Sequence, residues 1–113
     1  MTKHEELNIY FYKKTIPNWG IGNIIDTSQA LGVNKHLAFI NFLSGATIDG
    51  LIDTITVIQS GGVYDQEFLD NDEYFYGSGI SFGIPYFYAG VDQMIHMNDL
   101  KLLLQEWKDF INS

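Results

Sequence analysis

The sequence predicts a small α+β domain in which a mostly antiparallel sheet has helices packed on one of its faces. Near the N-terminus, apolar and polar residues alternate, which is the period of a half-buried strand. Two later segments repeat apolar residues at the period of a helix, and short strand-like runs broken by glycine lie between them. With 113 residues, the chain is expected to form a single domain, residues 1–113.

The first predicted element is a strand. Apolar and polar side chains alternate over residues 7–12, and Lys13, Lys14 and Pro17 are expected to end this strand. Residues 19–25 are ambiguous, but they contain two glycines, which favour a loop.

A helical turn and a central strand are predicted next. Asp26 is a suitable cap for a short turn that ends at Gly32. Residues 36–43 are apolar on both faces, which is typical of a strand in the middle of a sheet, and Gly45 is expected to end it.

A helix is predicted between Thr47, as N-cap, and Gly61, as C-terminal stop. Its apolar stripe consists of Ile48, Leu51, Ile52, Ile55 and Ile58. The β-branched run at residues 54–58 favours a strand instead, but the clean stripe favours the helix. Asp49 and Asp53 then lie four residues apart on the solvent-facing side.

An acidic connector, several short strands and a last helix are predicted to follow. The connector spans residues 65–73, and the strands are expected at residues 74–76, 80–84, 86–89 and 93–97. Asn98 is expected to cap the last helix. The apolar face of this helix consists of Leu100, Leu103, Leu104, Trp107 and Ile111.

Charge is the strongest functional feature of the sequence. The chain has 14 acidic residues, 6 lysines, no arginine and a net charge of −8. Positions 36–100 contain no lysine or arginine, but they contain nine of the acidic residues and five tyrosines. Such a surface repels nucleic acid and anionic membranes, and it attracts basic protein. The alternative interpretation is that the acidity only keeps the chain soluble.

Carboxylates beside tyrosines suit the centre of a protein interface, because aromatic side chains supply burial and charge speeds encounter. The residues expected to bind a partner are Asp49, Asp53, Asp65, Glu67, Asp70, Asp72, Glu73, Tyr74 and Tyr76. Tyr86 and Tyr88 also share one face of a predicted strand, with Phe87 on the other face. This alternation fits either a sheet with one apolar face or a tyrosine-lined binding surface.

No catalytic site, metal site or cofactor is predicted. The three histidines, His4, His36 and His96, are isolated in the sequence, so a structural role is favoured over catalysis for each. Residues 70–73 resemble the start of a calcium loop, but aromatic residues occupy the next two positions, where such a loop needs an oxygen ligand and a glycine. The absence of cysteine excludes a thiolate metal site and fits a reducing compartment.

A cytoplasmic location is expected. The first residues lack the apolar core of a signal peptide, and no apolar run approaches the roughly 18 residues of a membrane span. Neither membrane nor nucleic acid is expected as a partner.

The acidic composition without arginine or cysteine, together with the C-terminal third, resembles small bacterial immunity proteins. The similar segment is GIPYFYAGVDQMIHMNDL, from Gly83 to Leu100, which continues into the amphipathic helix through Trp107. Such proteins neutralise a toxin of a contact-dependent growth inhibition (Cdi) system or of a similar polymorphic toxin system. The resemblance implies a 1:1 inhibitor of a cognate basic toxin domain, of the nuclease type, without enzyme activity of its own.

Two other functions stay open from the sequence. One is a small α+β enzyme or ligand-binding domain with a tyrosine-lined pocket, which a deep pocket with converging polar groups would favour. The other is a structural subunit whose acidity only serves solubility.

Overall fold

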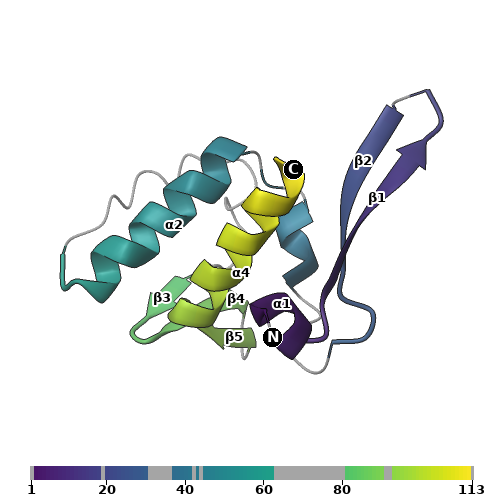
Figure 1. The fold of residues 1–113 in the computed structure, drawn as a ribbon. Coiled ribbons are helices and arrows are strands. Elements are labelled where there is room, and N and C mark those ends of the chain that lie inside the picture. Colours follow the sequence, from purple (N-terminus) through teal and green to yellow (C-terminus); the bar gives the residue numbers. More distant parts are fainter. Residues whose placement is uncertain are drawn as a thin grey trace.

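The structure, a computed structural model, describes residues 2–18, 20–30, 37–41, 43, 45–62, 81–90 and 93–112. In chain order the elements are α1 (Lys3–Glu6), β1 (Tyr10–Ile16), β2 (Gly20–Asp26), α2 (Gly45–Gln59), β3 (Ser81–Gly83), β4 (Tyr86–Gly90), β5 (Gln93–His96) and α4 (Met97–Ile111). The strands pair antiparallel in a two-stranded sheet, β1–β2, and a three-stranded sheet, β3–β4–β5. The predicted α+β class is confirmed, with the strands divided between two sheets (Figure 1).

α4 lies at the centre of the helical part of the molecule. It packs against α2 and α1, and against β4 and β5 of the three-stranded sheet. The β1–β2 hairpin extends to one side of this body (Figure 1). Among the described residues, none of the helices combines the length and the apolar character that a membrane span requires.

The apolar stripes predicted for α2 and α4 form much of the core. The buried side chains of these helices include Ile48, Leu51, Ile55, Ile58, Leu100, Leu103, Leu104 and Trp107. From the three-stranded sheet, Phe87 and Ile95 join the same core. Ile52 and Ile111, which also belong to the predicted stripes, are only partly buried.

The N-terminal segment is joined to α4 by aromatic packing and by hydrogen bonds. Phe11 of β1 lies edge-on to Trp107, with ring centroids 5.1 Å apart. The carboxylate of Glu106 accepts hydrogen bonds from the backbone N–H groups of Lys3 and His4, both at 2.8 Å. Because the first N–H groups of a helix have no partner within it, this carboxylate satisfies donors that α1 leaves open.

The strand predicted at the N-terminus is displaced along the chain. β1 begins at Tyr10 instead of Leu7, because α1 precedes it and Asn8, at φ 59°, redirects the chain. Lys13 and Lys14 lie within β1 instead of ending it. Both lysines are exposed on the hairpin, where a charged side chain stays hydrated and protects a strand edge.

β2 occupies most of the segment in which glycines favoured a loop, so that prediction is wrong. The strand pairs with β1 in register from Ile16 opposite Gly20 to Tyr10 opposite Asp26. A Cβ at Gly22 would lie 2.5 Å from Cδ1 of Ile16. Gly22 therefore marks a crowded strand, where the Ile16 side chain lies across the backbone.

The turn predicted after Asp26 is present. The carboxylate of Asp26 accepts a hydrogen bond from the Ser28 N–H at 2.8 Å, and the Ala30 N–H donates to the Thr27 carbonyl at 3.0 Å. The hydrogen bonds with Ser28 lower the pKa of Asp26. Gly32, the predicted end of the turn, lies outside the described residues.

The prediction of a central strand at residues 36–43 is wrong for the part of this range that the structure describes. Residues 37–41 form a short 3₁₀ helix in which Leu37 and Ile40 are fully buried. Phe39 packs its ring on Phe87, with centroids 6.0 Å apart. A short apolar run is compatible with a buried helix as well as with a strand, so its period could not separate the two.

α2 confirms the predicted helix over the strand alternative. Two of its β-branched residues, Thr54 and Thr56, donate their hydroxyls to carbonyls four residues earlier, which lets them fit the helix. The helix begins at Gly45, so Thr47 lies in the first turn and is not the N-cap.

The predicted stop of α2 is also confirmed. The N–H of Gly61 donates to the carbonyl of Ile58, and the N–H of Gly62 donates to the carbonyl of Val57. This pair of hydrogen bonds is the Schellman motif, and Gly61 adopts the left-handed φ of 83° that it needs.

β3, β4 and β5 confirm the last three predicted strands. The N-cap of α4 is His96 and not Asn98, so that prediction is wrong by two residues. The imidazole Nδ1 of His96 accepts a hydrogen bond from the Asn98 N–H at 3.1 Å, in place of the usual side-chain oxygen. The predictions for residues 65–79 lie outside the described residues.

We expect Gly61→Ala to destabilise the protein by about 1–2 kcal/mol, because an L-residue is strained at positive φ. Gly45→Ala is the matched control, since a Cβ at Gly45 would meet no atom within 4 Å. It should be neutral or stabilising by up to about 1 kcal/mol, because alanine favours a helix. Denaturant unfolding measures both, and equal midpoints for the two variants would contradict the left-handed cap.

We expect Trp107→Ala to cost about 3–5 kcal/mol, because it empties a large buried volume and removes the contact with Phe11. Leu102→Ala, on the exposed side of α4, should change stability by less than about 0.5 kcal/mol. Thermal melting compares the two variants. If the Trp107→Ala variant melts at the same temperature as the parent protein, α4 must pack against the core through another face.

Candidate functional site

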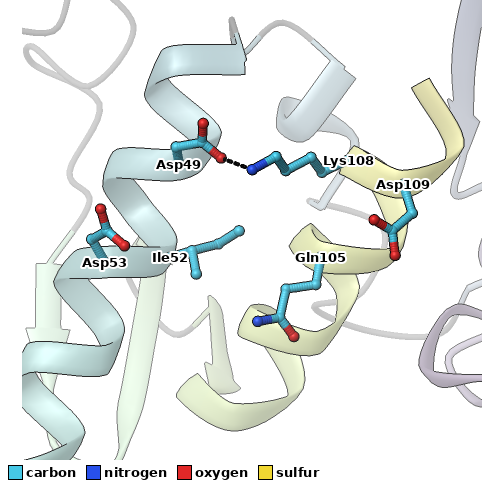
Figure 2. A pocket seen from close by; sticks show the side chains of 6 residues that line it. All are labelled: Asp49, Ile52, Asp53, Gln105, Lys108 and Asp109. Atoms are coloured by element: carbon cyan, nitrogen blue, oxygen red, sulfur yellow. Dashed lines mark ion pairs between the residues drawn. The ribbon is translucent and has the colours of Figure 1, made fainter. Parts of the chain in front are cut away.

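An acidic groove lies between α2 and α4. It has a volume of about 560 Å³ and is lined by Asp49, Ile52, Asp53, Gln105, Lys108 and Asp109. The first three come from α2 and the others from α4, as Figure 2 shows. Each helix turns its apolar stripe to the core, so residues at helical spacing beside that stripe meet across the groove.

One ion pair bridges the groove. The Nζ atom of Lys108 contacts Oδ1 of Asp49, and both side chains are about half exposed (Figure 2). The hydrogen bond and the charge of Asp49 raise the pKa of Lys108 above its ordinary value, and the charges of Asp109 and Asp53 add to this rise. Asp49 contacts this ammonium group, and the carboxylates of Asp53 and Asp109 line the same groove.

The structure brings together two of the residues predicted to bind a partner, Asp49 and Asp53. The other seven predicted residues, Asp65, Glu67, Asp70, Asp72, Glu73, Tyr74 and Tyr76, lie outside the described part of the chain. Lys108 and Gln105 lie outside the apolar face predicted for the last helix, and nothing in the sequence paired them with α2. The spacing of the polar residues on each helix could be recognised in the sequence, but the contact between the two helices could not.

The outer face of the three-stranded sheet carries the tyrosines of β4. Tyr86 lies opposite His96 and Tyr88 opposite Met94 in the pairing with β5. Tyr86 and Met94 are exposed, whereas Phe87 between the tyrosines is fully buried on the inner face. The alternation of this strand is therefore as predicted, with one core face and one face that presents tyrosine rings to solvent.

A smaller apolar hollow lies beside this face. It has a volume of about 220 Å³, and its lining residues are Ile58, Gln59, Ile84, Pro85, His96 and Met97. Tyr86 packs edge-on against His96, with ring centroids 5.9 Å apart, but it does not line the hollow. The described residues therefore do not form a tyrosine-lined pocket at this place.

Two histidines have structural partners. His4 Nδ1 lies 2.9 Å from the carbonyl of Ile9, and its ring stacks on Phe11 with centroids 4.3 Å apart. His96 caps α4. His36 lies outside the described residues. Within the described ranges, no three histidine, aspartate or glutamate side chains come together in a way that could hold a metal ion.

Comparisons with known protein families, with curated proteins and with solved structures found no significant match to this chain. The groove and the charge of the chain are therefore the features that bear on function.

We expect the ion pair across the groove to contribute little to stability, because exposed pairs lose in side-chain entropy what they gain in attraction. A double-mutant cycle with Asp49→Asn and Lys108→Met measures the coupling. Urea unfolding should give a coupling close to the experimental error. A large coupling would mean that the charges of Asp49 and Lys108 stabilise the fold, so that folding alone would explain them.

Proposed function

We propose that this protein is an immunity protein that binds and neutralises a cognate basic toxin domain. The observation that carries the proposal is the acidic groove, which is lined by the carboxylates of Asp49, Asp53 and Asp109 together with Lys108. The chain has a net charge of −8, and positions 36–100 contain no lysine or arginine. These charges add to the negative potential of the groove.

A basic nuclease is the kind of toxin that this charge fits. A nuclease holds phosphate groups with cations, so carboxylates can occupy the same place and exclude the substrate. Opposite charge also steers the two proteins together, which raises the association rate by one or more decades at low salt. An inhibitor must reach its toxin before the toxin reaches nucleic acid, so a fast encounter serves this function directly.

The groove is only a part of the proposed interface. A stable complex buries about 800 Å² on each partner, and its energy is concentrated in a few aromatic or charged anchors. The acidic and tyrosine residues at positions 65–76 are proposed to supply the remainder, in a 1:1 complex. The proposal needs no catalytic residue, metal or cofactor, and it places the action of the protein in the cytoplasm, where its toxin would act.

The proposal predicts that Asp49→Asn combined with Asp53→Asn slows association with the toxin domain and flattens its dependence on salt. The folded state should melt as before, because both carboxylates are exposed. Stopped-flow association at several salt concentrations, with a candidate basic toxin domain that the protein protects cells against, measures both effects.

The matched control is Glu5→Gln combined with Asp26→Asn. It removes the same charge away from the groove, and the new side chains keep an acceptor oxygen for Thr2 and Ser28. If the groove variant and the control associate equally fast at every salt concentration, the groove does not bind the toxin. If no basic toxin domain binds the parent protein, the proposed function is wrong.

A further inference from the structure

A second hollow lies on the other side of α4 from α2. Its volume is about 370 Å³, and it is lined by Thr2, His4, Phe11, Glu106, Asp109 and Phe110. Asp109 lines this hollow as well as the acidic groove. The carboxylate of Asp109 therefore lies between two neighbouring depressions.

Aromatic rings form the walls of this hollow. Phe11 stacks on His4, with ring centroids 4.3 Å apart, and lies 5.6 Å from the ring of Phe110. Phe110 in turn stacks on Trp107 at 5.8 Å. The rings thus support one another and are held in place by the buried Trp107, so the wall exists before any partner binds.

This aromatic wall already attracts a cation of the chain itself. The ammonium group of Lys13 lies over the Phe110 ring, 4.7 Å from its centroid. That distance is within the range of a cation–π interaction. Lys13 is not among the residues that line the hollow, whose aromatic side chains are those of His4, Phe11 and Phe110.

Carboxylates complete the hollow as a receptor for a cation. Glu106 is held by the N–H groups of Lys3 and His4, and each of its oxygens keeps a second lone pair for another donor. Asp109 has no hydrogen bond or ion pair to any residue in the described ranges. The Nδ1 atom of His4 lies 2.9 Å from the carbonyl oxygen of Ile9, so this ring nitrogen is already engaged.

We propose that this hollow binds an arginine side chain of the basic partner. The inference rests on the proposed function and names the surface and the chemistry that the partner would present. Arginine fits better than lysine because its planar guanidinium stacks on aromatic rings while its N–H groups bond to carboxylates. The partner would thereby place cationic side chains on both sides of Asp109, one in this hollow and one in the groove.

The test uses the full chain and N-acetyl-arginine amide as the probe, followed by NMR. The probe should shift the ring signals of Phe11 and Phe110 saturably, whereas N-acetyl-norleucine amide, which has an aliphatic side chain without charge, should not. Asp109→Asn and Phe110→Leu should each weaken binding by about two- to fivefold. Asp26→Asn, which removes one charge elsewhere and keeps the bond from Ser28, should leave the affinity unchanged.

Equal shifts from the norleucine probe would overturn the inference, and so would equal losses in Asp109→Asn and Asp26→Asn. Melting curves show whether Phe110→Leu still folds, and Asp109→Asn tests the site without touching the aromatic wall. Shifts confined to α2 would overturn the inference and leave the proposed function standing. Arginine binding in the hollow, together with failure to neutralise any basic toxin, would overturn the proposed function alone.

Discussion

The packing of α4 against its neighbours is the interaction on which the rest of this structure depends. One stripe of the helix contacts α2 and the three-stranded sheet, and Trp107 and Glu106 hold the N-terminal segment. The same helix also supplies Lys108 to the acidic groove and Phe110 to the aromatic hollow. The distance between the two depressions is therefore fixed by the width of one helix, and a change in its docking would alter both.

The charge of the chain is distributed unevenly. All 14 carboxylates lie outside residues 7–25, and this hairpin segment contains Lys13 and Lys14. In the described part, Lys3 is paired with Glu6 and Asp99, and Lys108 is paired with Asp49. The excess of negative charge repels itself and opposes compaction. The proposed association with a basic molecule would account for such an excess, whereas stability would not.

The long helices could be predicted from the sequence because their signals are local. The stripes on α2 and α4 and the stop at Gly61 are set by residues within a few turns of one another. The hairpin and the 3₁₀ helix at residues 37–41 could not be predicted in the same way. Ile25 is the one buried residue in β1 and β2, so the hairpin lacks the burial that gives a strand a clear period. The apolar run at 37–41 is buried in either conformation.

The candidate site was half predictable for a related reason. Asp49 and Asp53 could be predicted because they lie four residues apart on one helix, within the stretch of the chain that contains no lysine or arginine. That Lys108 and Asp109 face them depends on how α2 and α4 pack, which is a contact between segments far apart in the chain. The aromatic hollow depends on three such segments at once, from α1, β1 and α4.

The hydrogen bonds from Lys3 and His4 to Glu106 join residues that are 103 and 102 positions apart. Closing so long a loop has an entropic cost that only a largely ordered chain can offset. The N-terminal segment should accordingly join the fold after α2, α4 and the three-stranded sheet have assembled, and it should be the first to detach in native-state fluctuations. Hydrogen exchange at these two amides then reports local opening of α1, whereas the amides of Leu103 and Leu104 report unfolding of the whole core.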